Sequence, residues 1–237
     1  MKNVKALFFD VGGTVFDWKT SACQAIEGLA QTHNQTIDSE TFAWDWRSEM
    51  FKARAEVSQG QLPWMNADGM HLRALEILTP KYPLLEALDD PMSLVKETWH
   101  QLHTFPGAPE GINQLRSRYT VVVLTILSWE SVVNSSKRAN VQWDGILSCE
   151  FLGYYKPSRQ AYLKGISLLG LTPDESMMVA AHPADLAAAQ SAGMHTAYVN
   201  VPEEDIVFAE TGQSKPHSFD IEAEDYTDLC EQLGIDI

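Results

Sequence analysis

Positive charge is scarce in this sequence of 237 residues, because 17 lysines and arginines stand against 32 aspartates and glutamates, for a formal net charge of -15. A surface with this balance repels the phosphates of nucleic acids and of anionic membranes, so we expect neither as a partner. It also does not attract an anionic substrate over a distance. A site for an anion therefore needs arginine or lysine side chains placed inside it.

Cysteine is scarce as well. Cys23, Cys149 and Cys230 lie far apart, and their spacing matches no paired metal-binding motif. This usage is typical of a reducing compartment and argues against a disulfide framework or a zinc site. The sequence shows no signal-peptide pattern, no apolar run long enough to span a membrane, no internal repeat and no low-complexity segment. We therefore expect a cytoplasmic protein.

The chain alternates strand-like and helical patterns, which predicts an α/β fold. Short apolar runs bounded by turn residues are typical of strands buried on both faces. Strands that alternate with helices form a parallel, doubly wound sheet of the Rossmann-like kind. The predicted strands cover residues 4–9, 119–124, 145–149, 177–181, 196–199 and 219–221.

The stretch from the first helix to residue 100 has no strand-like run. It contains helical segments rich in aromatic residues, separated by turn signals at Gly60 and Pro80. We therefore predict a helical cap subdomain over residues 18–100, inserted into a core of residues 1–17 and 101–237. This insert either covers the loop after the first strand or only forms a small apolar core of its own.

Polar residues follow the predicted strands at four points: Asp10, Ser128, Lys156 and Asp185. The carboxyl ends of parallel strands meet at one edge of a sheet, where ligands bind, so we expect these side chains to share one crevice. Each residue also has a structural alternative. Asp10 and Ser128 suit helix caps, Lys156 suits a solvated loop, and Asp185 suits the first turn of a helix.

The order of these residues and the segments around them resemble the haloacid dehalogenase superfamily over essentially the whole chain. Within it, the pattern looks most like the type II L-2-haloacid dehalogenases. The matching segments are FDVGGTVFD at 9–17, LS at 127–128, YKP at 155–157 and MVAAHPADL at 178–186, with WR at 46–47 and GQLPW at 60–64 in the insert.

The resemblance implies hydrolysis of short 2-haloacids to 2-hydroxy acids, without a metal ion or a cofactor. Asp10 would attack the α-carbon and form an ester, which water then cleaves. Lys156 would keep Asp10 ionised, and Asp185 would orient Lys156 or the water. The residues that the resemblance places around the substrate or the departing halide are Val11, Gly12, Thr14, Arg47, Ser128, Trp129 and His182.

Two positions separate this chemistry from phosphoryl transfer. Phosphatases of the superfamily carry a second aspartate two residues after the nucleophile, where this chain has Gly12. They also hold Mg²⁺ with several carboxylates, one of which would stand at Ala181. The sequence therefore favours dehalogenation, with a phosphatase-like hydrolase and a non-catalytic relative as the alternatives.

Three residues depart from the dehalogenase pattern. Gly12 stands where an aromatic ring is usual, Trp129 where asparagine is usual, and His182 where an amide side chain is usual. These changes predict a repacked pocket. The identity, length and stereochemistry of the halogenated acid stay open, and so does the choice between a monomer and a homodimer.

Overall fold

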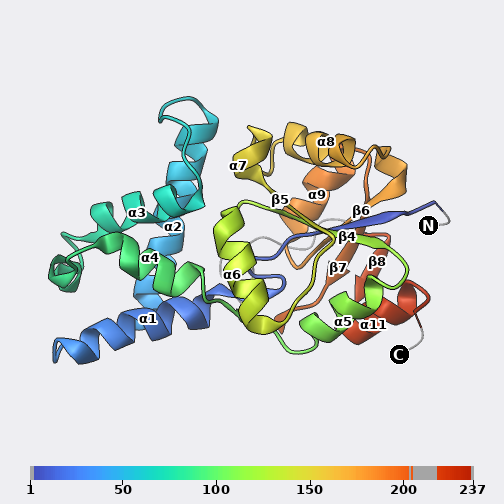
Figure 1. Ribbon diagram of the computed structural model, residues 1–237. Coiled ribbons are helices and arrows are strands. Elements are labelled where there is room, and N and C mark those ends of the chain that lie inside the picture. The colour runs from blue at the N-terminus through green and yellow to red at the C-terminus, as the bar shows by residue number, and fades with distance from the viewer. Residues whose placement is uncertain (1–2, 203, 205–217, 236–237) are drawn as a thin grey trace.

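The computed structural model describes residues 3–202, 204 and 218–235, and a parallel sheet forms its centre (Figure 1). The described part of this sheet has six strands, in the order β5-β4-β1-β6-β7-β8. Phe8 in the central strand pairs with Val122 on one side and Met178 on the other. This arrangement confirms the predicted doubly wound fold. The strands are β1 (Ala6–Phe9), β4 (Thr120–Thr125), β5 (Gly145–Ser148), β6 (Ser176–Ala180), β7 (His195–Val199) and β8 (Ile221–Ala223).

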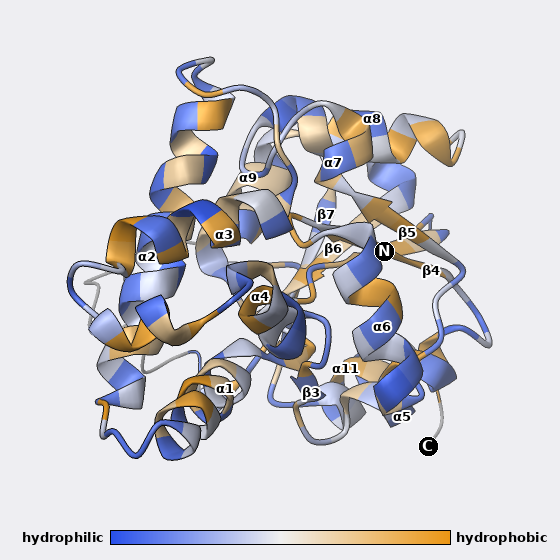
Figure 2. Cartoon of the chain, turned by 60° about the vertical axis from the view of Figure 1, so that its left-hand side comes forward, coloured by the Kyte–Doolittle hydropathy of each residue, from blue (hydrophilic) through white to orange (hydrophobic). Residues whose placement is uncertain are grey.

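Helices cover both faces of the sheet (Figure 1). α5 (Ala108–Leu115) packs against α11 (Tyr226–Gln232) on one face, and α8 (Arg159–Leu168) packs against α9 (Pro183–Ser191) on the other. Figure 2 shows strongly apolar strands between helices of mixed polarity, as expected for a sheet buried on both faces. No described helix combines the length and apolar character needed to cross a membrane.

The insert consists of helices that lie beside one end of the sheet (Figure 1). Most of them begin at an aspartate or asparagine whose side chain accepts a hydrogen bond from the first turn, which is a strong start signal. Asp17 caps the first of them, so the capping alternative for Asp10 does not hold. The elements are α1 (Trp18–Thr32), α2 (Ser39–Ser58), α3 (Ala67–Leu78), η1 (Pro83–Ala87) and α4 (Pro91–Trp99).

A short antiparallel ribbon stands where the chain enters and leaves the insert. β2 (Phe16–Asp17) pairs with β3 (His103–Thr104), two strands that are too short to predict from an alternating pattern. The division into a core of residues 1–17 and 101–237 and a cap of residues 18–100 stays a prediction, which the position of this ribbon supports.

Candidate active site

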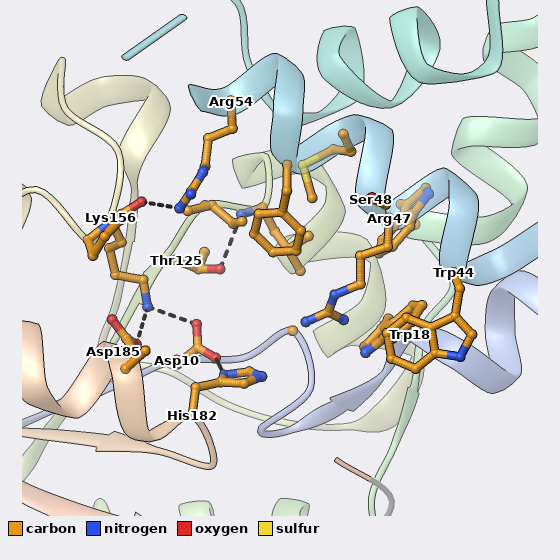
Figure 3. A pocket seen from close by; sticks show the side chains of 18 residues that line it. Asp10, Trp18, Trp44, Arg47, Ser48, Arg54, Thr125, Lys156, His182 and Asp185 are labelled. Atoms are coloured by element: carbon orange, nitrogen blue, oxygen red, sulfur yellow. Dashed lines mark hydrogen bonds and ion pairs between the residues drawn. The ribbon is translucent and has the colours of Figure 1, made fainter. Parts of the chain in front are cut away.

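A cavity of about 510 Å³ opens between α2 of the insert and the carboxyl ends of β1, β4 and β6 (Figure 3). The loops after these strands form its floor, and the insert forms its roof. This is the edge where an open α/β sheet binds ligands. Most of the wall is apolar, and its largest apolar side chains are those of Trp18, Trp44, Met50, Phe51, Trp99 and Leu127.

Asp10 lies directly after β1 on the floor of this cavity. Its Oδ1 accepts a hydrogen bond from Lys156 Nζ at 2.8 Å, and its Oδ2 accepts one from Thr14 Oγ1 at 3.0 Å. The same Oδ2 lies 2.9 Å from His182 Nδ1. Burial acts to raise the pKa of Asp10, but the charges and hydrogen bonds of Lys156 and His182 outweigh it and hold that pKa well below its usual range. Asp10 is therefore an ionised carboxylate that faces a largely apolar space.

Lys156 bridges two carboxylates. Figure 3 shows its side chain reaching between Asp10 and Asp185, and its Nζ lies 2.7 Å from Asp185 Oδ2. The hydroxyl of Tyr162 donates to the other oxygen of Asp185 and so fixes that carboxylate. Burial acts to lower the pKa of Lys156, but Asp10 and Asp185 outweigh it and raise that pKa. The lysine is thus a buried cation and not a solvated loop residue.

The loop after β1 lies close to the side chains of His182 and Glu204, and a glycine makes this approach possible. Gly13 has a φ of +89°, and a Cβ there would lie 2.8 Å from the Glu204 carboxyl group and 2.9 Å from His182 Nε2. Thr14 Oγ1 also accepts a hydrogen bond from the Ala181 backbone at 3.0 Å, so its hydroxyl braces the loop beneath Asp10. Val11 is buried in the same loop, and its side chain belongs to the apolar core.

Arg47 projects from α2 toward the cavity, as its predicted role requires. Its guanidinium carbon lies 4.0 Å from the centre of the Trp18 ring, and its Nη2 lies 4.0 Å from Glu204 Oε2. Glu204 also accepts a hydrogen bond from Trp18 Nε1 and lies 3.3 Å from His182 Nε2. Burial acts to raise the pKa of Glu204, but Arg47 and His182 outweigh it and lower that pKa. Sequence reasoning missed this buried carboxylate, because no motif surrounds it.

Arg54 is a second arginine that the sequence analysis did not single out. It follows Arg47 by seven residues, which places both on one face of α2, and both line the cavity. Its guanidinium donates to the backbone carbonyl of Lys156, and within the described ranges it has no carboxylate at ion-pair distance. The seven-residue spacing from Arg47 was the available signal for it.

Among the described residues, the site carries a small excess of positively charged side chains. Burial acts to lower the pKa of His182, but hydrogen bonds to Asp10 and Glu204 outweigh it and raise that pKa to about 9, so the imidazole is protonated at neutral pH. Such an excess is what a very acidic protein needs in order to hold an anion. Within the part of the chain that the structure describes, three carboxylates face four cationic groups: Asp10, Asp185 and Glu204 against His182, Lys156, Arg47 and Arg54.

The structure does not bring Ser128 and Trp129 to this cavity. β4 ends at Thr125, and Ser128 caps α6 (Trp129–Ala139) by accepting a hydrogen bond from the Ser131 backbone. Its hydroxyl donates to Asp68 at 2.9 Å, and Trp129 is 45% exposed to solvent. The residues that line the cavity after β4 are Thr125, Ile126 and Leu127. The substrate contacts expected for Ser128 and Trp129 are therefore not supported. Ser128 matches its helix-capping alternative, and Trp129 lies in the first turn of the helix that Ser128 caps.

The donor set around Asp10 does not fit a magnesium ion. Lys156 Nζ occupies the position between the two carboxylates of Asp10 and Asp185, and Gly12 and Ala181 offer no further side-chain oxygen. Mg²⁺ requires several oxygen ligands in an octahedral array. Elsewhere in the described part of the chain, one group brings three potential ligand atoms within 4.8 Å of one another, namely Asp68, His100 and Glu130, of which the first two already share a hydrogen bond.

Comparisons with known proteins identify similar chains. A family described as haloacid dehalogenase-like hydrolase matches residues 4–193. The L-2-haloacid dehalogenase PA0810 is 31% identical, with a TM-score of 0.89, and the match covers 97% of this chain and 98% of that one. The defluorinating L-2-haloacid dehalogenase Rha0230 is 30% identical, with a TM-score of 0.88 and coverage of 97% and 95%.

A more distant solved structure shares the fold. The L-2-haloacid dehalogenase from Xanthobacter autotrophicus is 18% identical, with a TM-score of 0.77, over 97% of this chain and 98% of that one. A search of curated proteins finds no match. The family match covers most of the chain and agrees with the resemblance drawn from the motifs. This protein therefore belongs to the haloacid dehalogenase-like hydrolases.

Proposed function

We propose that the protein hydrolyses the carbon–halogen bond of 2-haloacids and releases 2-hydroxy acids through an ester on Asp10. The observation that carries the proposal is the ionised Asp10 carboxylate, held by Lys156 at 2.8 Å at the base of an apolar cavity. An apolar wall leaves a carboxylate poorly hydrated and so more nucleophilic. The similar proteins PA0810 and Rha0230, both L-2-haloacid dehalogenases, support the same chemistry.

The first step needs no proton from the protein. A carboxylate oxygen of Asp10 forms a bond to the α-carbon while the carbon–halogen bond breaks, and the halide leaves with the electron pair. Halide is a good leaving group, so the absence of an acid at Gly12 does not hinder this step. Phosphoryl transfer to Asp10, in contrast, needs a group that protonates a poor leaving oxygen.

Two arginine side chains supply positive charge for the carboxylate of the substrate and for the departing halide. Arg54 has no carboxylate partner within the described ranges, and we assign it to the carboxylate of the substrate. Arg47 lies across the cavity beside Trp18, and we assign it to the departing halide. Both charges lie in a poorly hydrated space, where electrostatic interactions are stronger than in water.

The cavity is larger than a short haloacid needs. A volume of about 510 Å³ lies within the range of about 300–1,000 Å³ that is usual for ligand pockets. A 2-haloacid of a few heavy atoms displaces only a few water volumes of about 30 Å³ each. We therefore extend the proposal to 2-haloacids with longer side chains. We further propose that the reaction takes place in the cytoplasm and needs neither a metal ion nor a cofactor.

A halide-release assay tests the function. L-2-chloropropionate and bromoacetate are incubated with the wild type, with Asp10→Asn and with Asp174→Asn, a matched change at an exposed position. We expect halide from the wild type and from Asp174→Asn, with and without a metal chelator, and none from Asp10→Asn. Wild-type protein that releases no halide but hydrolyses phosphate esters with Mg²⁺ would overturn the proposal.

A further inference from the structure

Helix α11, near the other end of the chain, reaches the loop that carries Asp10. Tyr226 is the first residue of this helix and is 3% exposed. Its hydroxyl donates a hydrogen bond to the backbone carbonyl of Thr14 at 2.6 Å, although the two residues are 212 positions apart in the sequence. This buried contact joins α11 to the floor of the cavity.

Thr14 is the residue through which the contact reaches Asp10. The Thr14 hydroxyl donates to Asp10 Oδ2 at 3.0 Å and accepts from the Ala181 backbone at 3.0 Å. Lys156 and His182 also contact the Asp10 carboxylate, and both carry positive charge. Thr14 differs from them because it is a neutral donor that belongs to the same loop as Asp10. A shift of the Thr14 backbone therefore moves a direct partner of the nucleophile.

The turn after Asp10 leaves the Thr14 carbonyl without a partner of its own. The backbone N–H groups of residues 14, 15 and 16 all donate to the carbonyl of Val11, which closes the turn on its inner side. Within the described ranges, no backbone N–H donates to the Thr14 carbonyl. A buried carbonyl needs a hydrogen bond, and the Tyr226 hydroxyl supplies it.

We infer that Tyr226 is a positioning residue for the nucleophile: it holds the Thr14 backbone, and through the Thr14 hydroxyl it fixes the direction of the Asp10 carboxylate. The inference rests on the proposed function, because it concerns the attack of Asp10 on the α-carbon. Such an attack needs the reacting atoms in line and about 3–3.5 Å apart, and a misplacement of about 1 Å costs about 100-fold in rate.

The packing around Tyr226 makes room for this contact. α11 lies against α5 (Figure 1). A Cβ at Gly111 in α5 would lie 2.9 Å from Tyr226 Cβ and 3.4 Å from the tyrosine ring, so the close approach of the two helices requires glycine there. Cys230, one turn later on the same face of α11, lies 3.5 Å from the Gly111 carbonyl. Gly111 thus lets α11 place the tyrosine beneath the loop.

The hydroxyl of Tyr226 is the group that the core alone does not explain. The ring packs in the apolar core, where a phenylalanine ring would fill the same space. Burial of a hydroxyl is unfavourable unless it has a hydrogen-bond partner, which here is the Thr14 carbonyl. Burial and the negative charge of Asp10 both raise the pKa of Tyr226, so the hydroxyl keeps its proton and donates at neutral pH.

Single-turnover halide release from bromoacetate, with the protein in excess, tests the inference. The variant is Tyr226→Phe, which removes only the hydroxyl, and the matched control is Tyr119→Phe. The Tyr119 hydroxyl also donates to a backbone carbonyl, that of Leu233 at 3.1 Å, at a position outside the cavity wall. Variation of the protein concentration gives the maximal rate of alkylation and the concentration for half-saturation. Urea denaturation measures the stability of each variant.

We expect Tyr226→Phe to fold, because its ring fills the same space, and to slow the maximal rate of alkylation by about 10-fold, the factor that one buried hydrogen bond supplies. The concentration for half-saturation is expected to stay at the wild-type value, because the change does not touch the arginines assigned to the substrate. Tyr119→Phe loses stability as well but keeps the wild-type rate. A merely structural role for Tyr226 would give both variants the same kinetics.

A double-mutant cycle tests whether Tyr226 acts through Thr14. Thr14→Val removes the hydroxyl that contacts Asp10 and keeps a similar side-chain volume. In this background we expect Tyr226→Phe to slow alkylation by less than about 2-fold, whereas independent sites would give effects that multiply. The comparison of the two tyrosine variants decides the inference by itself if Thr14→Val reacts too slowly to follow.

Three results overturn the inference. They are a Tyr226→Phe variant that releases halide as fast as the wild type, a loss of rate that Tyr119→Phe shares, and a loss that appears only in the concentration for half-saturation. Failure of the proposed function looks different, because the wild type and both tyrosine variants would then all release no halide.

Discussion

Replacement of Lys156 by methionine removes the cation that joins Asp10 to Asp185 while keeping most of the side-chain volume. Lys156 Nζ lies 2.8 Å from one carboxylate and 2.7 Å from the other, and its side chain is 7% exposed. Removal of one partner from a buried ion pair costs about 3–5 kcal/mol, since the remaining charge stays buried without compensation. The variant is therefore expected to lose about that much free energy of unfolding at neutral pH.

The same change weakens the nucleophile. Without Lys156, the effect of burial on Asp10 is opposed less strongly, chiefly by the charge and hydrogen bond of His182, so the pKa of Asp10 rises from its present position well below the usual range. If the lost 3–5 kcal/mol appears in the barrier to alkylation, kcat/KM falls by a factor of about 10² to 10⁴. The acid limb of the pH profile of halide release is expected to move to higher pH.

The pH dependence of stability has a definite sign. The folded pKa of Asp10 is depressed, so its contribution to stability is present above the unfolded value of about 3.9 and disappears as the pH falls toward the folded value. The difference in unfolding free energy between wild type and Lys156→Met is therefore largest at neutral pH and narrows below about pH 4.

Halide release from pH 4 to 9 and urea denaturation at several pH values measure both effects. The matched control is Lys164→Met, at an exposed position of α8. A Lys156→Met variant that keeps the wild-type acid limb and wild-type stability would refute the argument, because Lys156 would then have no influence on Asp10. Equal losses in both lysine variants would show that the effect does not arise in the site.

Three further substitutions test the walls of the cavity. Gly12→Phe is expected to fold, since the nearest atom to a Cβ there is a Leu127 methyl carbon at 3.5 Å, and to raise KM for 2-bromohexanoate more than for bromoacetate. Gly13→Ala is expected to lower the free energy of unfolding by at least about 1 kcal/mol, measured by urea denaturation, because its φ is +89° and the new Cβ meets Glu204. Arg54→Gln is expected to raise KM for bromoacetate by about 10-fold or more, through loss of a charged hydrogen bond, and to leave the uncharged bromoacetamide unaffected. Equal effects of Gly12→Phe on both acids, unchanged stability of Gly13→Ala, or an unchanged KM in Arg54→Gln would each contradict the assignment.

The parts of the site that follow strands could be predicted from the sequence. Asp10 and Asp185 come after apolar runs. The carboxyl ends of parallel strands lie at one edge of the sheet, so these residues are brought together independently of the loop conformations. Lys156 does not directly follow a strand, because β5 already ends at Ser148, and its motif with Pro157 was needed to place it. In the structure, Lys156 Nζ lies 2.8 Å from Asp10 Oδ1 and 2.7 Å from Asp185 Oδ2.

Other parts depend on packing that no local pattern records. Glu204 follows β7, and its carboxylate contacts Trp18, Arg47 and His182 in the site. These partners are far away in sequence. Ser128 shows the opposite case. Its position after a strand suggested a ligand contact, but the start of α6 and the buried Asp68 engage its hydroxyl.

The most direct measurement follows oxygen in the first turnover. An excess of the protein is mixed with bromoacetate in H₂¹⁸O, and the peptide that contains Asp10 and the released glycolate are analysed by mass spectrometry. An ester on Asp10 predicts that the label enters Asp10, since water attacks Cγ, and that glycolate receives an unlabelled oxygen from the carboxylate. Label in the first-turnover glycolate, with none in Asp10, would contradict the account.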